Sequence, residues 1–218
     1  MKSSPKKSVH ALSLTAFVLV TVLAGCSSEA DEGPELEETT DASSPESTEH
    51  IPASADGPAQ NVPEPRLPAV ATENTEEGAR ATIEFFWRAI DHARLTGDTE
   101  LLALVSHDSC EFCQDNIVGW QERYSEGNWA VLQGEIEIAI DDTLTHFDEV
   151  QEEEWVEISF ELTEPAAELY VDGERDDAET LQDASTAKWV ADLSFDGSAQ
   201  RWNIEWLGIL DPAEELDL

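Results

Sequence analysis

Residues 154–162 read Glu-Trp-Val-Glu-Ile-Ser-Phe-Glu-Leu, and apolar side chains fill every second position from Val156 to Leu162. A period of two residues is typical of a strand with one buried and one solvated face. Such strands usually form antiparallel sheets that cover a core with one face. The same alternation occurs at residues 136–141, 189–195 and 202–206, and a weaker, short strand is expected at 168–171.

The polar positions of these strands are mostly acidic, and an acidic loop is expected at residues 174–185. Like charges side by side on neighbouring strands are unfavourable. We therefore expect the outer sheet face to be fully solvated and the stability of the domain to rise with salt. The acidic residues expected on this face are Glu135, Glu137, Asp141, Glu157, Glu161, Asp192 and Glu205.

The residues before the strands follow a helical period. Apolar residues recur at steps of three and four between Ala79 and Ala93, after a capping pattern at Asn74 and before Gly97. Two further helices are expected, a short one at 98–105 and another that opens with Asp108 and Glu111 and ends before Gly127. Helices followed by strands predict an α+β domain over residues 75–218, with three helices packed on a curved antiparallel sheet of four to five strands. This arrangement resembles the cone of the NTF2-like (cystatin-like) fold.

The N-terminal residues predict export. Lys2, Lys6 and Lys7 precede an apolar run of 13 residues that ends at Leu23, and crossing a membrane as a helix takes about 20. The sequence Leu-Ala-Gly-Cys at 23–26 has the form of a lipobox. We expect a lipoprotein signal peptide at residues 1–25, the general secretion route, and a lipid on Cys26 that anchors the chain to the outer face of the cell membrane. An uncleaved anchor, or cleavage that leaves Cys26 free, is the alternative.

Residues 26–74 are rich in Glu, Asp, Ser, Thr and Pro and contain almost no aromatic residues. Such a segment buries too little apolar surface to offset the entropy of ordering. We expect a disordered acidic stalk.

The whole chain has a net charge of −38, with 49 acidic and 11 basic residues. This charge repels nucleic acid, so we expect no nucleic-acid partner. The acidity is explained either by a saline habitat, which we favour, or by binding of cations or a basic partner.

A family resemblance rests on residues 78–127 together with the lipobox and the acidic segment. The region resembles an uncharacterised family of actinobacterial lipoproteins, known as a domain of unknown function with an NTF2-like appearance. The resemblance implies an actinobacterial origin and a surface lipoprotein, and it implies no reaction. The residues that carry it are Phe85-Phe86, Ala93-Arg94-Leu95-Thr96-Gly97-Asp98, Ser109-Cys110-Glu111-Phe112-Cys113 and Tyr124.

Cys110 and Cys113 are three residues apart at the start of an expected helix, which is within disulfide reach. We interpret them as a structural disulfide in an oxidising compartment. The alternatives are a redox-active pair and a metal site that also uses His107, for which no fourth ligand is identifiable. We expect no metal and no cofactor.

Two further sets of side chains are candidates for function. His92, next to Asp91, and His107, next to Asp108, could support acid–base catalysis, although neighbouring residues on a helix do not face each other. Aromatic residues clustered at an open end of the cone could line a pocket for an apolar ligand. This candidate pocket consists of Trp87, Tyr124, Trp129, Trp202 and Trp206.

The sequence has no Gly-x-Ser-x-Gly, P-loop, dinucleotide-binding or His-Glu-x-x-His motif. The leading hypothesis is a non-enzymatic lipoprotein that binds another component of the cell envelope. A carrier of a small apolar ligand is the second hypothesis, and a cryptic NTF2-like enzyme is the third.

Overall fold

The computed structural model describes residues 49–149, 153–181 and 183–210. Within these residues three helices come first and seven strands follow, which confirms an α+β domain with the helices before the strands. The helical elements are the 3-10 turn η1 (Ala69–Thr72), α1 (Glu76–Thr96), α2 (Glu100–Val105) and α3 (Glu111–Ser125). The strands are β1 (Trp129–Leu132), β2 (Glu137–Asp148), β3 (Glu153–Glu164), β4 (Ala167–Val171), β5 (Glu174–Leu181), β6 (Ser185–Asp196) and β7 (Arg201–Ile209).

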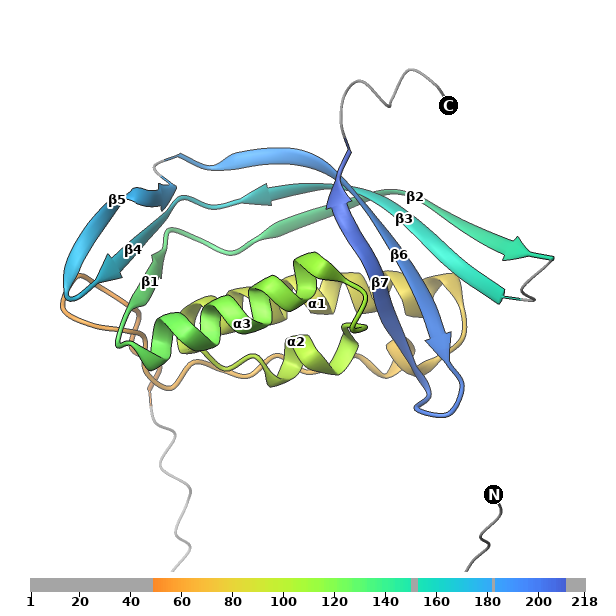
Figure 1. Cartoon of the computed structure of the whole chain (residues 1–218), viewed down its shortest axis with the longest axis horizontal. Coiled ribbons are helices and arrows are strands. Elements are labelled where there is room, and N and C mark those ends of the chain that lie inside the picture. The colour runs from red at the N-terminus through yellow and green to blue at the C-terminus, as the bar shows by residue number, and fades with distance from the viewer. Residues whose placement is uncertain (1–48, 150–152, 182, 211–218) are drawn as a thin grey trace, which may run out of the picture. The chain divides into compact units, whose positions relative to one another are not determined.

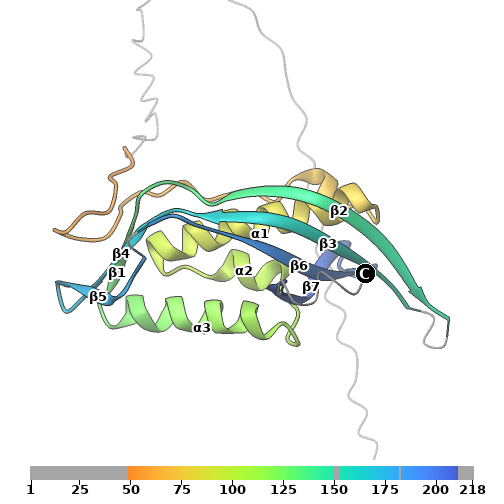
Figure 2. The ribbon, with the colours of Figure 1, turned by 90° about the horizontal axis from the view of Figure 1, so that it is seen from above.

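The strands form two antiparallel sheets, one of four strands in the order β2-β3-β6-β7 and one of three in the order β1-β4-β5. All three helices lie on one side of the four-stranded sheet, which curves around them (Figure 1; Figure 2). The opposite side of this sheet carries no helix within the described part of the chain. We call the helix-covered side the inner face and the other side the outer face.

The core lies between α1 and the inner face. Ile83, Phe86 and Ile90 of α1 are completely buried, as are Ile158 and Phe160 of β3. Alternation in the strands and the helical period of α1 therefore predicted the core correctly. Thr75, rather than Asn74, caps α1 by accepting a hydrogen bond from the Gly78 amide at 3.1 Å.

Gly97 ends α1 as predicted, and its environment shows why glycine is needed there. Its φ angle is +73°, in the left-handed region that favours glycine. A Cβ atom on Gly97 would lie 2.4 Å from the Tyr124 side chain. The turn after α1 therefore packs directly against an aromatic ring of α3.

The predicted number of strands, four to five, is too low, since the described residues form seven. The prediction of a loop at 174–185 is also wrong. Residues 174–181 form strand β5, which pairs with β4, and residues 129–132 form β1 on the other side of β4. Strand β5 has mostly charged side chains, a common property of edge strands. Pairing depends on backbone groups, which the side-chain pattern of an edge strand does not reveal.

The expected stalk also ends earlier than Asn74. Ala71 is completely buried, the Trp129 indole donates to the Ser54 carbonyl at 2.9 Å, and the Trp202 indole donates to the Glu73 carbonyl at 2.8 Å. Residues 49–74 are thus packed on the domain, because indole donors and apolar contacts offset the entropy of ordering them.

The predicted signal peptide and Cys26 lie outside the described residues. Within the described ranges, none of the helices combines the length and the apolar character that crossing a membrane requires.

Candidate functional site

The predicted aromatic pocket does not form, because two of its five members fill the core. Trp87 is 1% exposed, and its ring contacts those of Phe160 and Trp189 with centroids 6.2 and 5.3 Å apart. Trp202 is 2% exposed and packs edge-on against Phe195. The space between the helices and the inner face is occupied by these side chains at the place where the pocket was expected.

The other three members lie in different parts of the domain. The Tyr124 hydroxyl donates to the Arg94 carbonyl at 2.8 Å, and burial raises the pKa of this tyrosine to about 12. Trp129 stacks on Tyr170 in the three-stranded sheet with ring centroids 5.2 Å apart. Trp206 lies on the outer face and is 49% exposed. The sequence could not show this separation, since it depends on how distant strands are paired.

Cys110 and Cys113 form the predicted disulfide at the start of α3, and both are fully buried. Two of the three ligands that the metal-site alternative needs are therefore joined to each other. Within the part of the chain that the structure describes, no three His, Cys, Asp or Glu side chains are grouped so that they could hold a metal ion.

His107 belongs to a polar cluster between the α2–α3 loop and β7. Its Nδ1 lies 2.9 Å from the Ser109 hydroxyl and 2.7 Å from the Glu205 carboxylate, and the same hydroxyl donates to that carboxylate at 3.0 Å. A catalytic serine needs one imidazole nitrogen and the orienting carboxylate needs the other. Here both groups face the same nitrogen, so the cluster joins a loop to the sheet rather than activating the serine.

The outer face carries a row of four residues, one from each strand. Leu144 pairs with Glu157, Glu157 with Asp192, and Asp192 with Trp206. We call these four residues the outer row. Leu144 is 47% exposed and Trp206 is 49% exposed, so the row has exposed apolar side chains at both ends and two adjacent carboxylates between them.

Gly208 explains how the Trp206 ring is placed. A Cβ atom on Gly208 would lie 2.6 Å from the indole. The ring therefore lies over the glycine of the same strand and leans along the sheet, where any other residue would displace it. Gly208 therefore leaves room for the indole, about half of which faces solvent.

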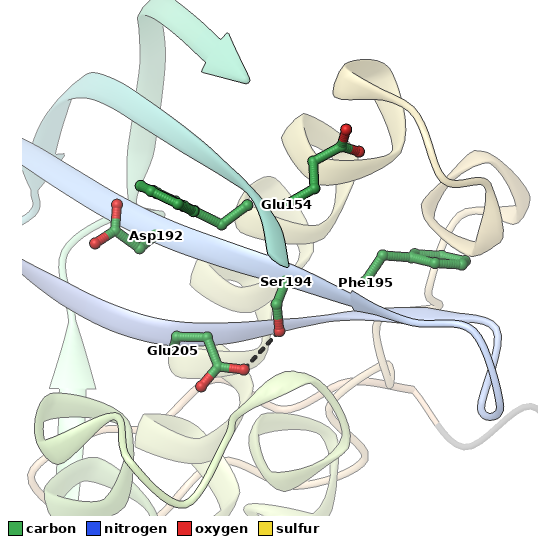
Figure 3. A pocket seen from close by; sticks show the side chains of 6 residues that line it. Glu154, Asp192, Ser194, Phe195 and Glu205 are labelled. Atoms are coloured by element: carbon green, nitrogen blue, oxygen red, sulfur yellow. Dashed lines mark hydrogen bonds between the residues drawn. The ribbon is translucent and has the colours of Figure 1, made fainter. Parts of the chain in front are cut away.

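Two shallow hollows flank the outer row, with volumes of about 620 and 580 Å³. Figure 3 shows the larger one, in which the Glu205 carboxylate turns towards Ser194 and accepts a hydrogen bond at 2.5 Å. The residues that line the two hollows include six carboxylates but a single basic side chain, Lys188. The Lys188 ammonium donates to the Asp141 carboxylate at 2.5 Å.

Two outer carboxylates are not fully solvated, in contrast to the expectation from sequence. Burial, together with the neighbouring Glu157, raises the pKa of Asp192 above its usual value. Glu205 is engaged by His107, Ser109 and Ser194. The ladder between β6 and β7 is irregular beside Glu205, and such irregularities re-aim side chains. The negative charge of Asp192 is thus unfavourable because the side chain is partly buried and lies beside Glu157.

His92 and Asp91 line a separate cavity of about 330 Å³ against α1. The His92 side chain lies 3.5 Å from the Thr96 hydroxyl. Sequence reasoning treated Asp91 only as a poor partner of His92 and missed that it is partly buried. Its place in the helical period, one residue after Ile90, was the signal that could have shown it near the core boundary.

Comparisons with known proteins give a family but no activity. No curated protein matches the chain. The crystal structure of the intermembrane space region of chloroplast protein ARC6 is similar at 12% identity and a TM-score of 0.44, with 63% of this chain and 98% of that one covered. The Kfla4162 protein from Kribbella flavida is similar at 18% identity and a TM-score of 0.34, with 66% and 100% covered.

The family comparison covers most of the domain. Residues 48–206 match the model of a family of unknown function, DUF6318, so the matched region begins before Asn74, as the packed segment 49–74 does. The lipoprotein character and the actinobacterial origin that the sequence resemblance implied remain predictions. The chain belongs to DUF6318, a family of unknown function.

Proposed function

We propose that this protein is a non-enzymatic binding module of the cell envelope, which docks a partner protein on the outer face of its four-stranded sheet. A lipid on Cys26 would hold it on the outer side of the cell membrane. The proposal rests mainly on one observation, the half-exposed Leu144 and Trp206 of the outer row.

These two side chains are not needed to complete the core. Exposed tryptophan is a common centre of protein interfaces, because it supplies a large contact area with few rotatable bonds. The fit of the Trp206 ring over Gly208 supports a preformed contact surface. A preformed surface loses less conformational entropy when a partner binds.

The charge of the outer face favours a basic partner. The six carboxylates that line the two hollows face one lysine, and that lysine is already paired with Asp141. A lysine or arginine placed between Glu157 and Asp192 would relieve their mutual repulsion. We therefore propose that the partner presents a basic segment with aliphatic or aromatic side chains.

The two other functions considered from sequence have weaker support. A carrier would need room inside the cone, and Trp87 and Trp202 fill that region. An enzyme would need an activated group, and the His107 cluster is not arranged for one. An NTF2-like cone remains our proposal for the finer fold class, supported by three helices that pack in the concave side of a curved antiparallel sheet.

Photo-cross-linking in living cells tests the docking surface. A benzophenone amino acid replaces Leu144 on the outer face, or, as a control, Val118, which is 49% exposed on α3. We expect one cross-linked partner at position 144 and none at 118. The cross-link should be lost in Trp206→Ala and in Asp192→Lys. Equal cross-linking at both positions, or a cross-link that survives Asp192→Lys, would contradict the proposal.

The lipid anchor is tested separately. Cys26→Ala should release the protein from the membrane fraction, and mass spectrometry of the wild-type N-terminus should find an acylated Cys26. Retention of Cys26→Ala in membranes would show that another element anchors the chain.

A further inference from the structure

A cavity of about 330 Å³ lies where three segments of the chain meet. It is bounded by residues 50–65, by the second half of α1 and by the link between β1 and β2. Its walls are largely apolar and include Val62, Pro63, Leu95, Leu132 and Ile136. This volume is at the lower end of the range for small-molecule pockets.

Asp91 is the polar group of this cavity that lacks part of its hydrogen bonding. Its Oδ2 atom accepts from the Ile136 amide at 2.8 Å. Its Oδ1 atom is buried and has no hydrogen-bond partner. A buried carboxylate oxygen without a partner is costly, and a cation bound beside the carboxylate would offset part of that cost.

The other charged and titratable groups around the cavity leave this oxygen unpaired. His50, Arg88, His92 and Glu135 also line it, but none of them is hydrogen-bonded to Asp91. Arg94, one turn further along α1, is paired with Glu164 at 2.6 Å. Burial raises the pKa of Asp91 to about 6, so the carboxylate is ionised at neutral pH.

We propose that this cavity binds a small primary amine with an apolar body, whose ammonium group pairs with the Asp91 carboxylate while the body contacts the apolar walls. A charged donor is favoured over a neutral hydroxyl, because only a cation also neutralises the partly buried negative charge of Asp91. An anionic ligand is disfavoured, since Asp91 and Glu135 line the cavity and the chain carries a net charge of −38. This site is independent of the outer face and of the function proposed for it.

The test uses the full chain and three probes of similar shape: benzylamine, benzyl alcohol and benzoate. Titrations at pH 7.5 are followed by two-dimensional NMR of the backbone amides. We expect benzylamine alone to give saturable shifts centred on Leu95 and Ile136. Asp91→Asn should weaken benzylamine binding at least tenfold, whereas Glu135→Gln, a loss of charge at the same cavity, should change it less than threefold.

Three results would overturn the proposal. The first is equal binding of benzylamine and benzyl alcohol, which would mean that the positive charge of the donor is not recognised. The second is non-saturable shifts spread over the acidic surface, which would mean general attraction to a negative protein. The third is unchanged affinity in Asp91→Asn.

A measurement on the wild-type chain covers the case in which Asp91→Asn does not fold. The carboxyl carbon of Asp91 is titrated by NMR with and without benzylamine. A bound ammonium group favours the ionised carboxylate, so benzylamine should lower the pKa of Asp91. An unchanged titration curve at saturating benzylamine would reject the proposal.

Discussion

The two faces of the four-stranded sheet differ in how far their large apolar side chains are buried. On the inner face, Ile158, Phe160 and Leu162 of β3 are completely buried under the helices. On the outer face, Leu144 and Trp206 are half exposed at the ends of a row with two adjacent carboxylates. The inner side chains follow from the need to form a core. The outer ones are not needed for a core, which is why we propose that this face binds a partner.

Truncation of one large side chain on each face tests this contrast most strongly. Phe160→Ala removes a completely buried ring and should destabilise the domain by about 3–5 kcal/mol. Trp206→Ala removes a half-exposed ring and should destabilise the domain by no more than about 1–2 kcal/mol. Urea unfolding followed by circular dichroism measures both. Similar losses for the two variants would mean that the outer face also supports the fold.

Asp91 on α1 tests how much free energy of unfolding is lost when a charged side chain is partly buried. Its pKa is raised from 3.8 to about 6 in the folded protein. Folding therefore favours the protonated form of Asp91. The stability that this gives the folded protein is fully present below pH 3.8 and is lost as the pH rises through 6. At pH 7.5, Asp91→Asn should be more stable than the wild type by up to about 3 kcal/mol, since the amide oxygen can still accept from Ile136.

The measurement for Asp91 is urea unfolding of both proteins at several pH values. The advantage of Asp91→Asn should shrink steadily between pH 7 and pH 4. Parallel stability curves for the two proteins across this range would show that Asp91 is not perturbed.

The Cys110–Cys113 disulfide should stabilise the start of α3, one of the helices that cover the inner face. Closing so short a loop restricts the unfolded chain only modestly, so Cys110→Ala/Cys113→Ala should lose about 2 kcal/mol. Thermal unfolding with and without reductant gives the same comparison without mutation. The double variant should not respond to reductant. Two reactive thiols in the wild type without reductant would contradict the disulfide.

The smallest effect is expected from the charges of the outer row. Glu157→Gln removes one of two adjacent carboxylates and should stabilise the domain by about 0.2–1 kcal/mol at low salt. Salt screens the repulsion in the wild type, so the difference should shrink at high ionic strength. Melting temperatures across a salt series measure this. A wild-type melting temperature that does not rise with salt would contradict the repulsion between these charges.

The sequence predicted the parts of the structure that depend on local patterns. Alternation from Val156 to Leu162 identified the inner face, and the close spacing of Cys110 and Cys113 identified the disulfide. The acidic character of the outer face was also predicted. These features depend on residues a few positions apart, where strand and helix geometry fix the outcome.

The sequence did not predict features that depend on long-range pairing. Strand β5 is held by backbone bonds to β4, and residues 49–74 are held by contacts with Trp129 and Trp202. The five aromatic residues of the expected pocket are separated because Trp87 and Tyr124 lie on different helices and Trp129 lies in the three-stranded sheet. Trp202 and Trp206 share β7, but the irregularity beside Glu205 leaves one buried and the other half exposed. The partial burial of Asp91 depends on the N-terminal segment and the β1–β2 link, which are distant from it in sequence.

Lys188 allows the outer face to be labelled selectively. It is the only lysine in residues 8–218, and it lines the same hollow as Trp206. Amine-reactive reagents applied to this stretch of chain can therefore acylate one side chain only. Coupling to beads through that amine would turn the outer face towards the support and hide it, whereas a small environment-sensitive dye on the same amine would report when the hollow is covered.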